Sequence, residues 1–139
     1  MKAGAVKQQA TFGSADGLVL ALGFVVSLTG EPHALVRAAV AAGLAELVGM
    51  TSGSWLSDAS SGFGPAITNG GAAFGACVLP AVPYMAGSGA AALTLSLLLV
   101  AAVAGVIAWL RPERGVLAVV QTYGVLLTAA ALCFAASLL

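Results

Sequence analysis

The chain has 139 residues, of which 60% are hydrophobic and 7% are charged, and its mean hydropathy is +1.06. Soluble domains carry roughly 25% charged residues, so this composition excludes a water-soluble fold and predicts an integral membrane protein. The length leaves room for several spans of about 20 residues but hardly for a separate soluble domain. The formal net charge is zero and no basic run occurs, which argues against nucleic acid as a partner.

Five apolar runs follow one another along the chain and predict membrane-spanning helices. A closed barrel also pairs every backbone amide in lipid, but these runs lack the period-two alternation of barrel strands. Short loops rich in Gly, Pro or charged residues separate the expected spans, which are residues 12–30, 34–57, 65–85, 90–110 and 116–138. We therefore expect an all-α, polytopic membrane protein in which residues 1–139 form a single five-helix domain.

Basic residues predict the orientation of the spans. Lys2 and Lys7 precede the first span, but no small-residue cleavage site follows it, so we expect a retained helix and not a cleaved leader. With five spans, both lysines lie on the same side as Arg111 and Arg114, and only Arg37 lies near the other side. The positive-inside rule then places the amino terminus in the cytoplasm, and the absence of an organelle signal favours a plasma or inner membrane.

Glu46 lies near the middle of the second expected span, where the sequence is otherwise nearly free of charge. A charged acid at bilayer depth costs at least about 2.5–3.5 kcal/mol, so such a residue usually faces a partner, a cavity or an ion path. Met50 is four residues away and shares a helix face with Glu46. A carboxylate oxygen beside a thioether suits a borderline ion such as Fe²⁺ better than Mg²⁺.

Asp16 is a second acid, inside the apolar boundary of the first span. From the residues alone it is either a helix N-cap or an ion ligand, and neither role excludes the other. Thr51, Thr68 and Asn69 add neutral oxygen donors to the second and third spans. These side chains either contribute ligands or form hydrogen bonds within and between helices.

Small residues recur every four positions in two spans and predict close helix packing. They are Ala41, Ala45, Gly49 and Gly53 in the second span and Gly71 and Gly75 in the third. We expect these two helices to pack tightly against each other or across a dimer axis. Pro80 and Pro83 lie near the outer end of the third span, where they either end the helix or form part of a gate.

Four motifs occur in order along the first three spans. They are FGSADGLV at residues 12–19, GLAELV at 43–48, MTSGSWLS at 50–57 and LPAVPY at 79–84. In this order they resemble the first-helix, second-helix and third-helix signatures of the vacuolar iron transporter family. Residues 58–64 leave no room for the family's carboxylate-rich cytoplasmic domain, so the chain resembles a short form. Glu46 and Met50 are one helical turn apart, where the family has about two.

The resemblance implies a homodimer of five-helix subunits that moves Fe²⁺, and often Mn²⁺, out of the cytosol in exchange for protons. Asp16, Glu46 and Met50 fall on motif positions associated with the family's metal pathway, which implies that they bind the transported ion near the dimer axis. The metal is then the substrate, and no cofactor is expected. Deprotonated acids would take the ion from the cytosol, and protonation from the far side would release it, which gives alternating access.

Two other functions fit parts of the sequence. A small proton-coupled exporter of organic cations would also use a membrane acid, but it needs an aromatic-lined pocket and only 6% of the residues are aromatic. A non-transporting membrane scaffold would use its acids only to cap or bridge helices. We expect no enzyme, because His33 is the only histidine and neither a nucleophile–base pair nor a phosphate-binding loop is recognisable.

Overall fold

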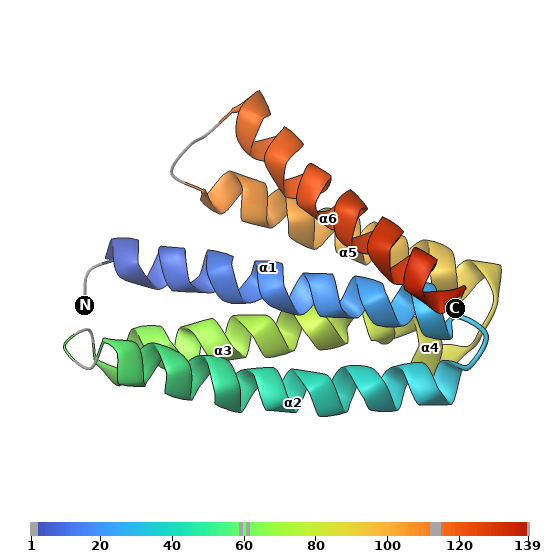
Figure 1. Cartoon of the computed structure of the whole chain (residues 1–139), viewed down its shortest axis with the longest axis horizontal. Coiled ribbons are helices and arrows are strands. Elements are labelled where there is room, and N and C mark those ends of the chain that lie inside the picture. The colour runs from blue at the N-terminus through green and yellow to red at the C-terminus, as the bar shows by residue number, and fades with distance from the viewer. Residues whose placement is uncertain (1–2, 59, 61, 112–114, 139) are drawn as a thin grey trace.

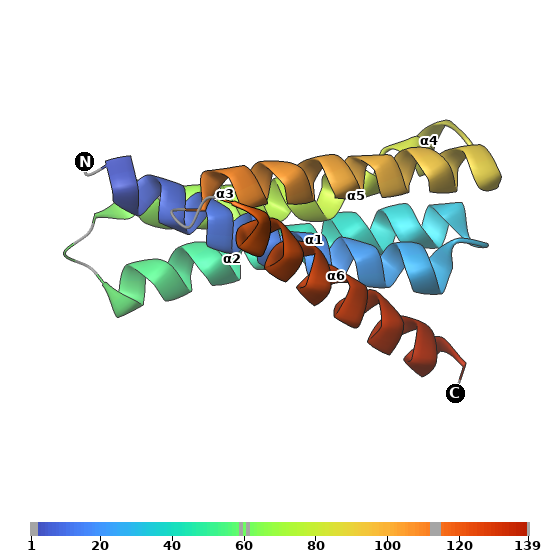
Figure 2. The ribbon, with the colours of Figure 1, turned by 90° about the horizontal axis from the view of Figure 1, so that it is seen from above.

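The computed structural model describes residues 3–58, 60, 62–111 and 115–138, and these contain helices without strands. The elements in chain order are α1 (Ala3–Leu28), α2 (Pro32–Ser57), α3 (Phe63–Val78), the 3₁₀ turn η2 (Leu79–Ala81), α4 (Pro83–Ala86), α5 (Ala90–Leu110) and α6 (Val116–Ser137). Figure 1 shows α1, α2 and α3 running alongside one another, with α5 and α6 on the other side of α1. In Figure 2, α6 crosses the other helices at an oblique angle.

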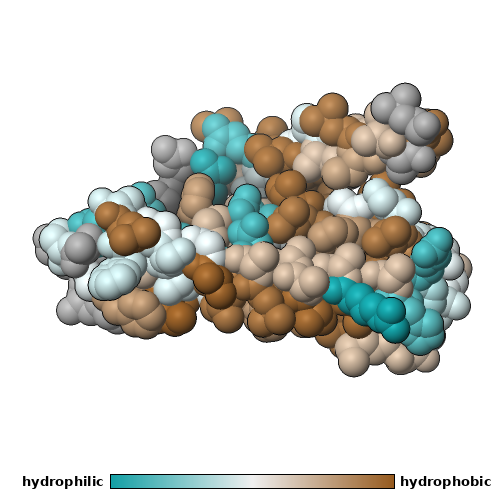
Figure 3. Space-filling view, turned by 60° about the horizontal axis from the view of Figure 1, so that its bottom comes forward, coloured by the Kyte–Doolittle hydropathy of each residue, from teal (hydrophilic) through white to brown (hydrophobic). Residues whose placement is uncertain are grey.

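Five segments are long and apolar enough to cross a bilayer, and α3, η2 and α4 together form the third of them, Phe63–Ala86. This is the arrangement of an integral, multi-pass membrane protein, and it confirms the predicted all-α fold with five spans. The third segment is the most buried of the five and has the lowest mean hydropathy. Figure 3 shows apolar side chains over much of one face, with hydrophilic ones at its right-hand end and in patches nearer its middle.

α1 begins at Ala3, well before the expected start at residue 12. Its first turns contain Ala, Lys and Gln, which are good helix formers, so the helix extends beyond the apolar run. Asp16 consequently lies in the middle of α1, where the helix already pairs its backbone amides. The N-cap alternative for Asp16 is therefore wrong.

The basic residues that the structure describes lie at the two ends of the bundle, near the predicted loops. Lys7 and Arg111 border one cavity at the end where the chain begins, and Arg37 lies toward the opposite end, in the first turns of α2 (Figure 1). Lys2 and Arg114 lie outside the described residues. The cytoplasmic placement of the amino terminus stays a prediction.

Gly13 and Gly17 bring the backbone of α1 very close to that of α3. A Cβ atom on Gly13 would overlap the backbone carbonyl of Asn69, and one on Gly17 would overlap that of Ala73. The two helices run in the same direction, so a step of four residues on α1 matches a step of four on α3. Hydrogen is the largest side chain that fits at either position, which permits this close helix packing.

α2 packs against α3 through a different row of residues. A Cβ on Gly43 would lie 3.0 Å from Val78 Cγ2, and one on Gly70 would overlap the Thr51 hydroxyl and the Leu47 carbonyl. Gly43, Leu47 and Thr51 are spaced four residues apart, so they form one ridge of α2. This ridge, and not the predicted one, holds the two helices together.

The small residues singled out in the sequence face away from the rest of the chain. Ala41 and Ala45 are exposed, and a Cβ on Gly49, Gly53, Gly71 or Gly75 would meet nothing within 4 Å. Their predicted role in packing α2 against α3 is therefore wrong. The physical reason is that the bulky side chains of Phe74 and Val78 need the space that Gly43 leaves. A contact across a dimer axis stays a prediction for these residues.

The third span continues past Pro80 through the 3₁₀ turn η2. The buried Ser96 hydroxyl of α5 donates a hydrogen bond to the Pro80 carbonyl at 2.6 Å. On the other side, the buried Tyr84 hydroxyl lies 3.2 Å from the Thr29 hydroxyl at the end of α1. The break in the helix is thus fixed by polar contacts to both neighbours.

Substitution of Gly17 tests the contact between α1 and α3. We expect Gly17→Ala to destabilise the fold by about 1–3 kcal/mol, because the added methyl group overlaps backbone that cannot rotate away. Gly124→Ala in α6 is the matched control: the added Cβ meets no neighbour within 4 Å among the described residues and adds helix propensity, so stability should be equal or higher. Thermal unfolding in detergent measures both variants, and equal melting temperatures would contradict the contact.

Substitution of Ser96 tests the support of the proline break. Ser96→Ala leaves the Pro80 carbonyl without its donor, which should cost about 1–3 kcal/mol of stability. Thr94→Val is the control, because the exposed Thr94 hydroxyl donates only to the Ala90 carbonyl of its own helix. A Ser96→Ala protein that unfolds at the same temperature as the control would show that the bond adds nothing to stability.

Candidate metal site

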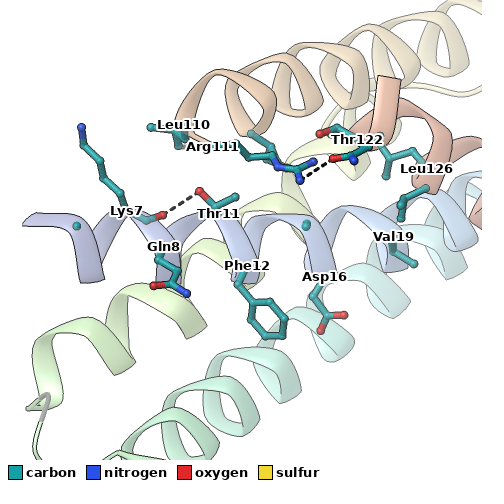
Figure 4. Close-up of a pocket in the computed structure, with 15 residues that line it drawn as sticks. Lys7, Gln8, Thr11, Phe12, Asp16, Val19, Leu110, Arg111, Thr122 and Leu126 are labelled. Atoms are coloured by element: carbon teal, nitrogen blue, oxygen red, sulfur yellow. Dashed lines mark hydrogen bonds between the residues drawn. The ribbon is translucent and has the colours of Figure 1, made fainter. Parts of the chain in front are cut away.

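The carboxyl groups of Asp16 on α1 and Glu46 on α2 lie close enough to interact electrostatically. Both residues are half-buried. Figure 4 shows Asp16 directed toward α2 and away from Arg111. Two ionised carboxylates at this separation repel each other, and a shared proton or a bound cation relieves the repulsion. We call these two residues the acid pair.

Met50 and its neighbours form a chain of polar contacts that joins three helices. The Asn69 amide nitrogen, on α3, donates a hydrogen bond to the Ser54 hydroxyl on α2 at 2.6 Å. The same nitrogen lies 4.0 Å from Met50 Sδ. Ser54 in turn donates to the side-chain oxygen of Gln9, on α1, at 3.5 Å. The thioether is thus held beside neutral polar groups, one helical turn from Glu46.

The structure brings the predicted site residues together to different degrees. Asp16 and Glu46 lie close enough to interact, whereas Met50 shares a face of α2 with Glu46 and lies beside Asn69. The sequence reasoning did not select Ser54 or Gln9. Ser54 lies on the same four-residue ridge of the sequence as Glu46 and Met50, but that spacing alone does not single it out as a ligand.

Of the three neutral donors considered from the sequence, only Asn69 joins this group. The Thr68 hydroxyl donates to the Gly64 carbonyl of its own helix at 2.9 Å. Thr51 faces Gly70, and its buried hydroxyl oxygen has no hydrogen-bond partner among the described residues.

Asn69 is 2% exposed, and its side-chain oxygen Oδ1 also lacks a hydrogen-bond partner among the described residues. The oxygen lies against α1 at Gly13, where an added Cβ would be only 2.7 Å away. An unsatisfied buried acceptor costs about 1–3 kcal/mol. Gly13 therefore makes room for Asn69 but offers its oxygen no N–H donor.

The donor set consists of two carboxylates, a thioether, an amide and a hydroxyl group. In the described part of the chain, no group of three or more His, Cys, Asp and Glu residues could hold a metal ion. An ion at the acid pair would therefore draw further ligands from sulfur, from neutral oxygens, from water or from another subunit. Mixed oxygen and sulfur donors suit borderline transition metals better than Mg²⁺.

A cavity of about 1170 Å³ opens on another side of α1, between α1, α5 and α6. Asp16 borders it, together with the basic residues Lys7 and Arg111 and the aromatic Phe12. Arg111 donates a hydrogen bond to the side-chain oxygen of Gln121 at 2.8 Å (Figure 4). Asp16 thus lies beside Glu46 of α2 and also borders this cavity.

Comparison of the chain with models of known families, with curated proteins and with solved structures finds no match. The resemblance to vacuolar iron transporters therefore rests on the four sequence motifs. A functional assignment draws on those motifs and on the chemistry of the acid pair and its neighbours.

Proposed function

We propose that this protein is a membrane transporter that exports a divalent transition-metal ion, Fe²⁺ or Mn²⁺, from the cytosol in exchange for protons. The observation that supports this most directly is the proximity of Asp16 and Glu46, which lie on two spanning helices. Acids at bilayer depth are costly unless a partner compensates their charge. A divalent cation compensates both at once, and the resemblance of the motifs supports the same function.

Met50 supports a transition metal over Mg²⁺. Its thioether lies one turn from Glu46 on the same face of α2, and Asn69 fixes its surroundings. Mg²⁺ prefers an octahedron of oxygen ligands and retains several waters, so a sulfur donor adds little to its binding. Fe²⁺ is a softer ion and gains more from the same ligand.

Proton exchange follows from the ligand chemistry of the proposed site. Carboxylates bind a metal ion only when deprotonated, so protons compete with the ion for Asp16 and Glu46. In the proposed cycle the ion enters from the cytosolic end, and protons from the far side displace it. The exposed small residues of α2 and α3 provide a face for close contact with a second subunit, in keeping with a homodimer.

The cavity beside Asp16 disfavours export of organic cations. Such a substrate needs apolar and aromatic walls without competing positive charge, whereas Lys7 and Arg111 both border this cavity. Phe12 is the only aromatic residue among those that line it in the described part of the chain. Substitution of Glu46 distinguishes the proposed transporter from a membrane scaffold without transport activity.

Substitution of Glu46 tests the proposed transport. In proteoliposomes with a pH gradient, the wild-type protein should move Fe²⁺ or Mn²⁺, and Glu46→Gln should reduce the flux by roughly a hundredfold, since even outer-shell partners of a metal cost 10–100-fold. Glu31→Gln is the control, because Glu31 is exposed between α1 and α2. Normal flux in Glu46→Gln would contradict the proposal, as would exchange of organic cations without any metal movement.

Substitution of Met50 tests the choice of metal. Met50→Leu keeps the size of the side chain but removes the sulfur, so the preference for Fe²⁺ over Mg²⁺ should fall by about tenfold. Met85→Leu makes the same change at an exposed position in α4 and should leave the preference intact. Competition between the two ions during uptake measures the preference. An unchanged ratio in Met50→Leu would mean that Met50 serves only for packing.

A further inference from the structure

Asn69 lies at the centre of the polar contacts beside the acid pair but is not itself part of that pair. Its amide nitrogen contacts the Ser54 hydroxyl at 2.6 Å and lies 4.0 Å from the Met50 sulfur. Its oxygen is buried and lacks a partner among the described residues. The side chain thus holds an unused oxygen ligand within one bond rotation of a sulfur ligand.

A half-turn about the Cβ–Cγ bond exchanges the oxygen and nitrogen of Asn69 with almost no change in shape. After this rotation, the oxygen takes the place of the nitrogen beside Ser54 and Met50. The Ser54 hydroxyl has one proton, which would then be donated to the Asn69 oxygen in place of Gln9. The Asn69 oxygen and the Met50 sulfur would face the same space.

The spacing of these two atoms suits a shared metal ion. Metal–oxygen and metal–sulfur bonds measure about 2.1 and 2.3 Å at zinc sites, so two such ligands can lie up to about 4.4 Å apart. The position that the oxygen would occupy is 4.0 Å from Met50 Sδ. One ion could therefore contact both atoms without movement of either helix.

We propose that Asn69 and Met50 form a second binding position for the transported ion, next to the acid pair, with Ser54 and Gln9 at its edge. This inference rests on the proposed function and extends it. Met50 is four residues, about 6 Å along the helix axis, from Glu46, so its sulfur can serve both positions. The ion passes between neutral ligands and acids while it keeps one ligand in common.

The second position lies toward the end of the bundle that holds the start of α1 and the connection from α2 to α3 (Figure 1). Gln9 and Ser54 lie nearer that end than Asp16 and Glu46 do, as their places in α1 and α2 require. In the proposed orientation this is the cytosolic end. The ion then meets neutral ligands first, and the negative charge of the acid pair draws it onward.

Mn²⁺ binding to the full chain in lipid nanodiscs, followed by electron paramagnetic resonance, tests this second position. Asn69→Leu removes the oxygen at similar size and should weaken Mn²⁺ binding by roughly tenfold or more. Asn69→Asp offers an anionic oxygen in the same place and should tighten binding at mildly alkaline pH, where the metal displaces its proton. Thr68→Val is the control, since the Thr68 hydroxyl bonds only within α3, and it should bind Mn²⁺ as the wild type does.

These results distinguish the second binding position from the proposed transport function. Unchanged affinity in both Asn69 variants, with binding lost in Glu46→Gln, overturns the second position and leaves the proposed function standing. Weaker binding in Asn69→Leu without tighter binding in Asn69→Asp also overturns it, because a purely structural residue gives that pattern. If Asn69→Leu does not assemble, Asn69→Asp alone decides. A wild-type protein that binds no Mn²⁺ overturns both proposals.

Discussion

The contact of α1 with α3 at Gly13 and Gly17 is the constraint on which the candidate site depends. Two glycines four residues apart direct one face of α1 onto the α3 backbone. Asp16 lies beside that face along the helix and is therefore directed toward α2, where it meets Glu46. The same contact encloses Asn69 beneath α1. A larger residue at either glycine would move α1 outward and separate the groups that face one another.

The charges of the side chains explain how acids and neutral donors would contribute differently to one metal site. When ionised, Asp16 and Glu46 carry two negative charges, and either one divalent ion or two protons compensate them. In the proposed site, Asn69, Ser54 and Met50 would add ligands without adding charge, which would raise its selectivity without raising the cost of keeping it in lipid. In the proposed transporter, the acids supply the competition with protons and the neutral groups supply the discrimination between metals.

Composition and hydropathy were sufficient to predict the helical class and the five spans, because lipid leaves few alternatives for the backbone. They placed the start of α1 too late, since hydropathy detects the apolar run and not the polar turns before it. Packing faces were harder to predict: with 18 glycines in the chain, small residues line several ridges, and only the shapes of Phe74 and Val78 select Gly43. The approach of Asp16 to Glu46 depends on how α1 and α2 pack. The resemblance of the motifs could suggest that the two acids share a site, but their separation in the sequence could not.

The burial of the third span has a consequence for how the protein enters the membrane. This segment has the lowest mean hydropathy of the five, contains Asn69 and two prolines, and is also the most enclosed by its neighbours. The Asn69 amide nitrogen is paired with Ser54 of α2, and the Pro80 carbonyl is paired with Ser96 of α5, so neither group is left to the lipid. α5 and α6 have higher mean hydropathy, so we expect this span to depend more than they do on neighbouring helices when it enters the bilayer. We therefore expect membrane insertion to be cooperative at the same helix that carries Asn69, the neutral ligand of the proposed site.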